Sequence, residues 1–232
     1  NWSFTLLASL LYPLLSIEVV EKIILSVYLT GFVGAAFYFF RSLSTEKTIL
    51  GFGAFLFSYN WFLMMGFYNF CLALPLLLFV LGYCLRHRGV FHPHRVATAM
   101  LLFVALYFSH IVGFGIALVV LAFLCGCFGQ KRGRALGELG LCVLPAAVLF
   151  AVYFFSHPHP PAPTISAPIS WRLANAVTLK IAPGFDRMEV IWLVGVWAVL
   201  GYWIVRSLWH AHPATHEDRP WWLIVLVLAF LC

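Results

Sequence analysis

The sequence predicts an all-α fold: a polytopic bundle of transmembrane helices with about seven complete spans, a short N-terminal interfacial helix and a truncated last span. Of its 232 residues, 63% are hydrophobic and only 9% are charged, and the mean hydropathy is +0.98. A soluble domain carries about 25% charged residues, so this chain has too few to solvate a globular surface. Long apolar runs also alternate with short charged loops, and about 20 apolar residues suffice to cross a ~30 Å hydrocarbon core.

The first half of the chain divides into a surface segment and three spans. Residues 1–15 are apolar but short and contain Pro13, which favours an interfacial or re-entrant segment. A second helix is expected from Ser16, as its N-cap, to about residue 40. Residues 48–85 are about twice as long as one crossing, so they must fold back. The expected bend is at residues 66–69, where Gly and Asn tolerate turn geometry.

The second half supplies the remaining spans. Residues 96–128 form another double span, with its turn near Ser109-His110 or at residues 113–115. Residues 136–155 and 190–208 are one span each. The apolar run at 221–232 is too short to cross and predicts a truncated span. We therefore expect residues 1–232 to be a single transmembrane domain, a fragment of a longer chain.

The distribution of Lys and Arg predicts the orientation. Ten of the 14 basic residues fall in the loops at 41–47, 86–95, 131–134 and 206–219. The alternate loops hold only Lys22, Arg172, Lys180 and Arg187. Because cytoplasmic loops collect basic residues, the first set is predicted to be cytoplasmic. The net charge of +6 then needs no nucleic-acid partner, and the expected location is a bacterial cytoplasmic membrane, with multiple crossings.

The segment at 157–189 is expected to be an extracytoplasmic loop. Its first half is rich in proline and should be stiff and extended, while residues 170–181 have the apolar spacing of a short helix on the membrane surface. Two interpretations remain open: a simple connector with an interfacial anchor, or a lid whose Arg172, Lys180 and Arg187 face lipid phosphates.

Polar side chains near the two outward bends are the candidate site. Polar groups at membrane depth are costly and tend to be functional or internally paired. They are Ser58, Tyr59, Asn60, Tyr68, Asn69, Tyr107, Ser109 and His110. His110 could bind a sugar hydroxyl or phosphate, or act as a base; alternatively it is a headgroup-level residue paired with a backbone carbonyl. For Asn60 and Asn69, hydrogen bonding between helices is an equal alternative.

Acidic and metal-binding residues indicate little chemistry of their own. Glu18 and Glu21 share a helix face and could bind a cation or act as a general base, or they simply solvate the start of a helix. Three His-x-His pairs stand in loops on different sides, without Cys or acidic residues at zinc-ligand spacing. We therefore predict no metal site and no disulfide, although a divalent cation is left open as a cofactor.

The segments 58–60, 66–70 and 106–110 resemble those of bacterial polytopic proteins grouped with the GT-C-type membrane glycosyltransferases. The resemblance implies a sugar donor linked to polyprenyl phosphate, with transfer on the extracytoplasmic face. In that family an acidic residue in the first large external loop acts on the acceptor. The chain shows no such loop, so no catalytic residue is assigned and the acid is expected upstream of residue 1.

The resemblance assigns substrate-binding roles to seven residues. Tyr59, Asn60, Asn69 and His110 would line the sugar pocket, and Arg172, Lys180 and Arg187 would hold the lipid phosphate. The expected partners are membrane lipids and the lipid-linked donor. The competing class is a non-enzymatic polytopic membrane protein, either a transporter or a structural subunit. A transporter should show broken helices and charged groups near the bilayer midplane.

Overall fold

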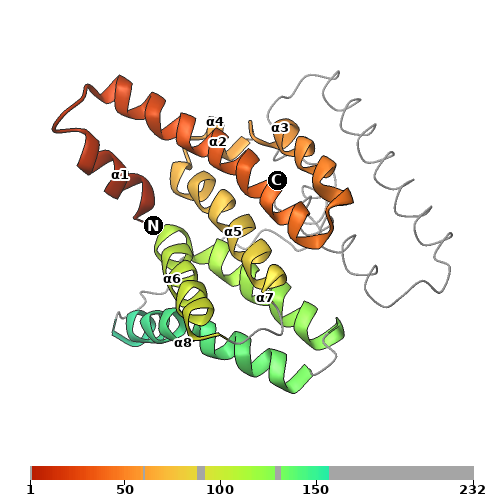
Figure 1. Ribbon diagram of the computed structural model, residues 1–232. Coiled ribbons are helices and arrows are strands. Elements are labelled where there is room, and N and C mark those ends of the chain that lie inside the picture. Colours follow the sequence, from red (N-terminus) through yellow and green to blue (C-terminus); the bar gives the residue numbers. More distant parts are fainter. Residues whose placement is uncertain (1, 60, 88–91, 129–131, 157–232) are drawn as a thin grey trace, which may run out of the picture. The chain divides into compact units, whose positions relative to one another are not determined.

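A computed structural model describes residues 2–59, 61–87, 92–128 and 132–156 (Figure 1). Within these ranges every regular element is a helix, which confirms the all-α class. The elements are α1 (Ser3–Leu11), α2 (Ile17–Leu43), the 3-10 helix η1 (Glu46–Gly53), α3 (Ala54–Phe57), α4 (Trp61–Met64), α5 (Tyr68–Arg86), α6 (Pro93–Ser109), α7 (Ile111–Phe128) and α8 (Arg132–Ser156). They belong to a compact unit that covers residues 1–161.

The core is built around α2 and α5, which run parallel to each other. Near their starts the Tyr68 hydroxyl bonds Glu21, and near their ends the rings of Tyr38 and Phe79 stack with centroids 4.7 Å apart. Gly82 lets the two backbones approach closely, because a Cβ there would lie 3.0 Å from the Cα of Phe39. Ser16 begins α2 in the extended conformation expected of an N-cap, although its side chain makes no capping hydrogen bond.

Because α2 and α5 are parallel, the chain between them must return to the end where α2 begins. Residues 46–67 make this return as several short helices instead of one continuous helix. The ring of Phe52 packs against Phe37, with 5.0 Å between centroids, and the Tyr28 hydroxyl donates to the carbonyl of Ser58 at 2.8 Å. The segment therefore runs back along α2 in the opposite direction, as the 3-10 helix η1 followed by the short helices α3 and α4.

The later helices alternate in direction. The Tyr83 hydroxyl donates to the carbonyl of Arg95 at 3.5 Å, and Phe70 contacts His110, so α6 runs antiparallel to α5. The turn between α6 and α7 falls at His110, which confirms one of the two predicted positions; residues 113–115 lie inside α7 instead. The predicted bend at residues 66–69 is also confirmed, with Gly66 at φ 75° directly before α5.

The predicted number of spans is too high for the described residues. Three helices are long and apolar enough to cross a membrane: Ile17–Leu43, Tyr68–Arg86 and Gly133–Ser156. Two further apolar helices, Pro93–Ser109 and Ile111–Cys125, are shorter, and the span expected from residue 48 to the bend is broken into η1, α3 and α4. The expected spans at 190–208 and 221–232, and the loop at 157–189, lie outside the described residues. The single domain over 1–232 stays a prediction.

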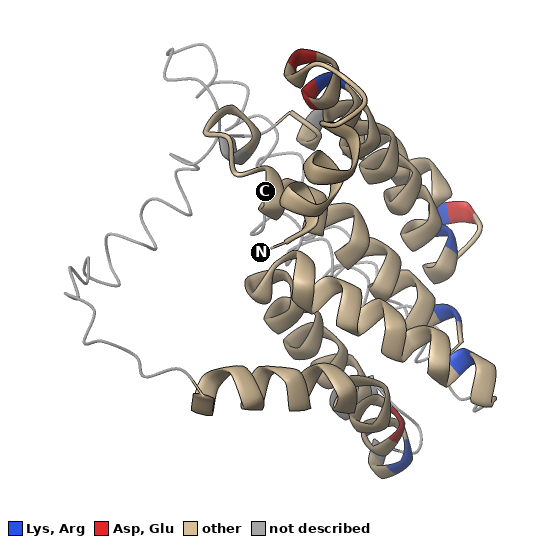
Figure 2. Cartoon of the chain, turned by 90° about the vertical axis from the view of Figure 1, so that its left-hand side faces the viewer, with Lys and Arg blue, Asp and Glu red and all other residues tan. Residues whose placement is uncertain are grey.

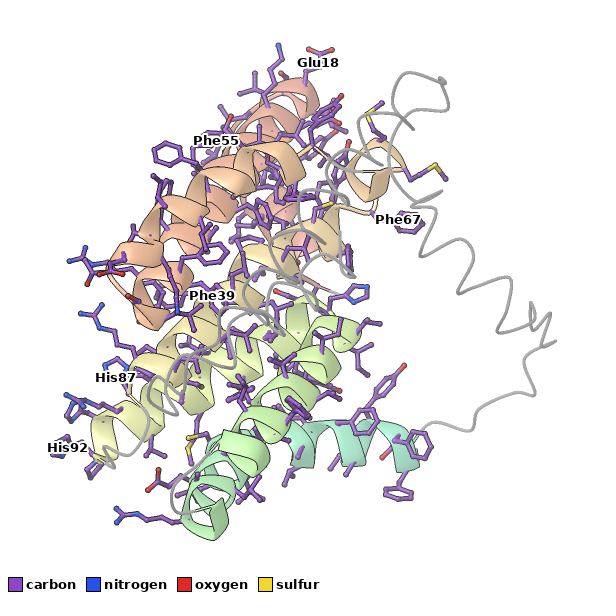
Figure 3. All side chains as sticks on the ribbon, turned by 90° about the vertical axis from the view of Figure 1, so that its right-hand side faces the viewer. Glu18, Phe39, Phe55, Phe67, His87 and His92 are labelled. Carbon is purple, nitrogen blue, oxygen red and sulfur yellow. The ribbon has the colours of Figure 1, made fainter. Side chains whose placement is uncertain are left out.

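Charged side chains divide the unit into two ends. We call the end that holds Arg41, Lys47, Arg86, Arg95 and Arg134 the basic end. The opposite end, where α2 and α5 begin and α6 meets α7, is called the polar end; Glu18, Glu21 and Lys22 lie there. In Figure 2 one group of red and blue segments lies at the top, apart from the other blue and red segments at the right and below. Figure 3 likewise separates Glu18 and Phe67 from His87 and His92.

α1 lies at the polar end and carries no buried residue. Leu6 and Leu10 of α1 are 56% and 63% exposed, and Trp2, which precedes the helix as its N-cap, is 67% exposed. A short helix with this much exposed apolar surface suits the membrane interface that the sequence predicts for residues 1–15.

Candidate functional site

Asn69 connects two segments that are far apart in the sequence. It is the second residue of α5, and its Oδ1 accepts hydrogen bonds from the backbone N–H of Phe4 at 2.8 Å and from the hydroxyl of Ser3 at 3.2 Å. Phe4 lies in the first turn of α1, whose leading N–H groups have no partner within the helix. Asn69 therefore caps α1 from outside it. Its remaining amide group, Nδ2, is the part that a ligand could engage.

Tyr68 adds a second link at the same end. Its hydroxyl donates to Oε1 of Glu21 at 2.5 Å, and its ring stacks on Phe4 with centroids 5.0 Å apart. A short bond to a carboxylate is stronger than one between neutral groups. This contact holds the carboxylate of Glu21 against the first residue of α5, which precedes Asn69 in the chain.

His110 lies between α6 and α7 and caps the second of them. Its Nδ1 accepts from the N–H of Val112 at 3.3 Å, and its carbonyl accepts from Phe114 at 3.1 Å. A nitrogen that accepts carries no proton, so this hydrogen bond assigns the neutral imidazole with its proton on Nε2. Burial lowers the pKa of His110, which also favours the neutral form.

Phe70 joins the two parts of the polar end. Its ring meets that of His110 edge-on, with 5.3 Å between centroids, and it follows Asn69 directly in the chain. Close by, the backbone N–H of Trp2 donates to the carbonyl of Phe108 at 2.9 Å, which attaches α1 to the end of α6. We call Glu21, Tyr68, Asn69 and His110 the polar cluster. It offers one carboxylate, one hydroxyl, one amide and one imidazole N–H.

The structure brings together only part of the predicted site. Asn69 and His110 are linked through Phe70, which follows Asn69 in the chain and contacts the His110 ring, and the alternative role of Asn69 in hydrogen bonding between helices is confirmed. The alternative for His110 differs in detail, because its ring accepts from a backbone N–H. Tyr59 lies in the segment 46–67 that connects α2 to α5. It is 60% exposed, and no contact between described residues links it to the polar cluster. Asn60, Arg172, Lys180 and Arg187 lie outside the described residues.

The pairing of Glu21 with Tyr68 was not predicted from the sequence. The sequence pattern pairs Glu21 with Glu18, three residues away, and places Tyr68 among the polar residues near the bend at 66–69, without linking the two. A usable signal was present, because the span order already placed the start of α2 and the bend at 66–69 on the same side. Nothing in the sequence pattern, however, indicates which side chains there would meet.

Within the described residues, no group of three or more His, Cys, Asp or Glu side chains could hold a metal ion. The cysteines described there, Cys71, Cys84, Cys125 and Cys142, take part in no disulfide. The cluster's own carboxylate, Glu21, is bonded to a tyrosine. What the polar cluster offers a ligand is therefore its hydrogen-bonding groups: a carboxylate, a hydroxyl, an amide and an imidazole N–H.

Comparisons with protein-family models, with curated protein sequences and with solved structures find no match to this chain.

Proposed function

We propose that the chain is the membrane-embedded part of a glycosyltransferase that uses a polyprenyl-phosphate-linked sugar on the extracytoplasmic face of a bacterial membrane. The observation that supports this most is the polar cluster, which gathers hydrogen-bonding side chains from α2, α5 and the α6–α7 turn at one end of an otherwise apolar bundle. The opposite end carries the excess of Arg, which favours the cytoplasmic side for that end. The polar end would then face outward, where the sugar of such a donor is presented.

In this proposal the cluster binds the sugar. The Nε2–H of His110 and the Nδ2 group of Asn69 would donate hydrogen bonds to hydroxyl or phosphate oxygens. Glu21 would accept from a sugar hydroxyl in place of, or alongside, Tyr68. Arg172, Lys180 and Arg187 remain the proposed contacts of the lipid phosphate, since cations stabilise a departing phosphate. The general base for the acceptor hydroxyl is assigned to no residue of this chain.

The test is a transfer assay with the full-length protein in membrane vesicles, supplied with radiolabelled polyprenyl-phosphate sugars. His110→Ala and Asn69→Ala should each lower transfer by roughly tenfold or more, because one lost hydrogen bond to a charged or transition-state oxygen is worth about 1.5–3 kcal/mol. Thr98→Ala is a matched control, since its exposed hydroxyl bonds only the carbonyl of His94 in the same helix. Unchanged transfer in both variants would remove the cluster from the site.

A second candidate function is transport. It is favoured by the segment 46–67, which is divided into η1, α3 and α4 where the sequence predicts one continuous span. Irregular backbone at membrane depth is tolerated where protein buries it or where it lines a water-filled cavity, and transporters place their substrate sites at such breaks. The break follows Ser58, whose carbonyl is held by the buried Tyr28 near the middle of α2. Solute uptake by proteoliposomes that is lost in Tyr28→Phe, together with absent sugar transfer, would favour transport over the enzyme.

A further inference from the structure

The basic end has one region where positive charge is not balanced by acidic residues of the same elements. Arg86 is the last residue of α5, and Arg95 is in the first turn of α6. The Tyr83 hydroxyl donates to the Arg95 carbonyl at 3.5 Å and so brings the two helix ends together. We call Arg86, His87, His92, His94 and Arg95 the α5–α6 basic patch. In Figure 2 some of the blue Lys and Arg segments have no red segment beside them.

The sequence explains the imbalance. No Asp or Glu occurs between Glu46 and Glu138, so α5, α6 and α7 contribute no carboxylate at all. By contrast, Arg134 forms an ion pair with Glu138 at 2.9 Å, one helical turn away. Arg86 and Arg95 of the patch therefore have no carboxylate on their own helices to pair with, whereas Arg134 has one.

The patch is also positioned to receive an anion. The guanidinium carbon of Arg86 lies 5.9 Å from the centroid of the Tyr38 ring, and Tyr38 in turn stacks on Phe79. At this distance the ring attracts the Arg86 cation, and because a guanidinium carries five N–H donors, its contact with Tyr38 leaves others for an anion. His92 and His94 are exposed, and their rings lie 5.6 Å apart and nearly parallel.

We propose that the α5–α6 basic patch binds the phosphate of an anionic phospholipid in the leaflet at the basic end. Guanidinium groups bind phosphate through two parallel hydrogen bonds, and both Arg side chains stand at helix ends, where lipid headgroups meet the protein. Charge complementarity selects an anionic headgroup over a zwitterionic one, which offers the same phosphate together with a competing cation. This interaction is separate from the polar cluster and does not depend on the proposed sugar transfer.

The experiment compares lipid adducts of the purified full-length protein by native mass spectrometry. Detergent-solubilised protein is titrated with an equimolar mixture of dioleoyl phosphatidylglycerol and dioleoyl phosphatidylcholine. The wild type should retain phosphatidylglycerol preferentially. Each Arg near a membrane surface contributes about a fivefold change in affinity, so Arg86→Gln with Arg95→Gln should reduce the preference by about 25-fold. Arg134→Gln, whose charge is already paired, should change it less than about twofold.

Two further arms keep the proposal open to refutation. If the double variant loses helicity, the test uses the wild type alone. Its preference for phosphatidylglycerol should fall as the salt concentration rises from 0.1 to about 1 M, because the Debye length shortens to ~3 Å. Equal retention of the two lipids, a double variant that keeps its preference, or an Arg134→Gln variant that loses it as strongly would each overturn the proposal. So would salt-sensitive binding to an acidic peptide without any preference between the lipids.

Discussion

The two ends of the unit are held by different kinds of contact. At the polar end, hydrogen bonds join residues that are far apart in the chain: Asn69 bonds Phe4, and Tyr68 bonds Glu21. At the basic end, the side-chain bonds are mostly made within one helix, as between His87 and the carbonyl of Tyr83 or between Arg134 and Glu138. Long-range bonds fix the relative positions of elements, whereas local bonds do not.

This difference suits two different tasks. A binding site for a defined ligand benefits from side chains that are already held in place, because less conformational freedom is lost on binding. A surface that meets fluid lipid headgroups needs accessible charge more than fixed geometry. The polar cluster fits the first description, and the α5–α6 basic patch fits the second.

The largest effect is expected at Gly82, where α2 and α5 approach each other closely. In Gly82→Ala, the new Cβ would meet the Cα of Phe39 at 3.0 Å and a ring carbon of Tyr38 at 2.9 Å, so α2 and α5 must move apart. We expect a loss of about 1–3 kcal/mol in unfolding free energy, measured by detergent denaturation. Gly34→Ala is the control, because nothing lies within 4 Å of its Cβ position. Equal loss in both variants would mean that helix packing at Gly82 is not the cause.

Asn69→Ala should have the next largest effect and should act at the polar end alone. It removes the acceptor for Phe4 and Ser3, and loss of an N-capping side chain costs about 0.5–2 kcal/mol. Amide exchange should become faster in α1 and stay unchanged in α6. Ser9→Ala removes an exposed bond to the carbonyl of Leu6 within α1 and should leave exchange nearly as it is. Faster exchange in α1 from Ser9→Ala alone would contradict the capping role of Asn69.

A smaller effect is expected from the bond between Tyr68 and Glu21. Because this pair is exposed, a double-mutant cycle with Tyr68→Phe and Glu21→Gln should give a coupling of about 0.5–1 kcal/mol. The same cycle with Glu18→Gln in place of Glu21→Gln should give about zero, within the ~0.3–0.5 kcal/mol additivity of unconnected sites. A coupling of equal size for Glu18 would show that the effect is general electrostatics at the start of α2.

The smallest effect is a change in pH dependence at His110. Because burial lowers its pKa in the folded protein, the unfolded chain takes up the proton first as the pH falls. The stability of the wild type should therefore decrease below about pH 6.5, the ordinary pKa of histidine. His110→Asn can still accept the hydrogen bond from Val112 but does not titrate, so its stability should vary less over the same range. A slope equal to that of the wild type would assign the effect to other groups.

The sequence predicts some of this fold and not the rest, for identifiable reasons. The starts of α2 and α5 were predicted because Ser16 and Gly66 act through local backbone preference. The breaks between residues 46 and 67 were not, since residues 48–65 form an apolar stretch without Lys, Arg, Asp or Glu that is long enough for one span. They depend on tertiary contacts, such as the Tyr28 hydroxyl with the Ser58 carbonyl, that no local pattern encodes.

The same distinction applies to the polar cluster. The sequence indicates Asn69 and His110 as candidates because polar groups at membrane depth are costly and tend to be functional or internally paired. Their partners could not be predicted, because Phe4 and Glu21 lie 65 and 47 residues from the side chains that they contact. Only the packing of α1 and α2 against α5 decides those pairs.

The assignment of the two ends to opposite faces of a membrane can be tested directly by labelling single cysteines in a cysteine-free background. Glu18 and His92 are both exposed and stand at opposite ends (Figure 3). With a membrane-impermeant maleimide, Glu18→Cys should be labelled in intact cells, and His92→Cys only after the membrane is made permeable. Labelling of both residues from the same side would contradict the two-ended arrangement and, with it, both proposed sites.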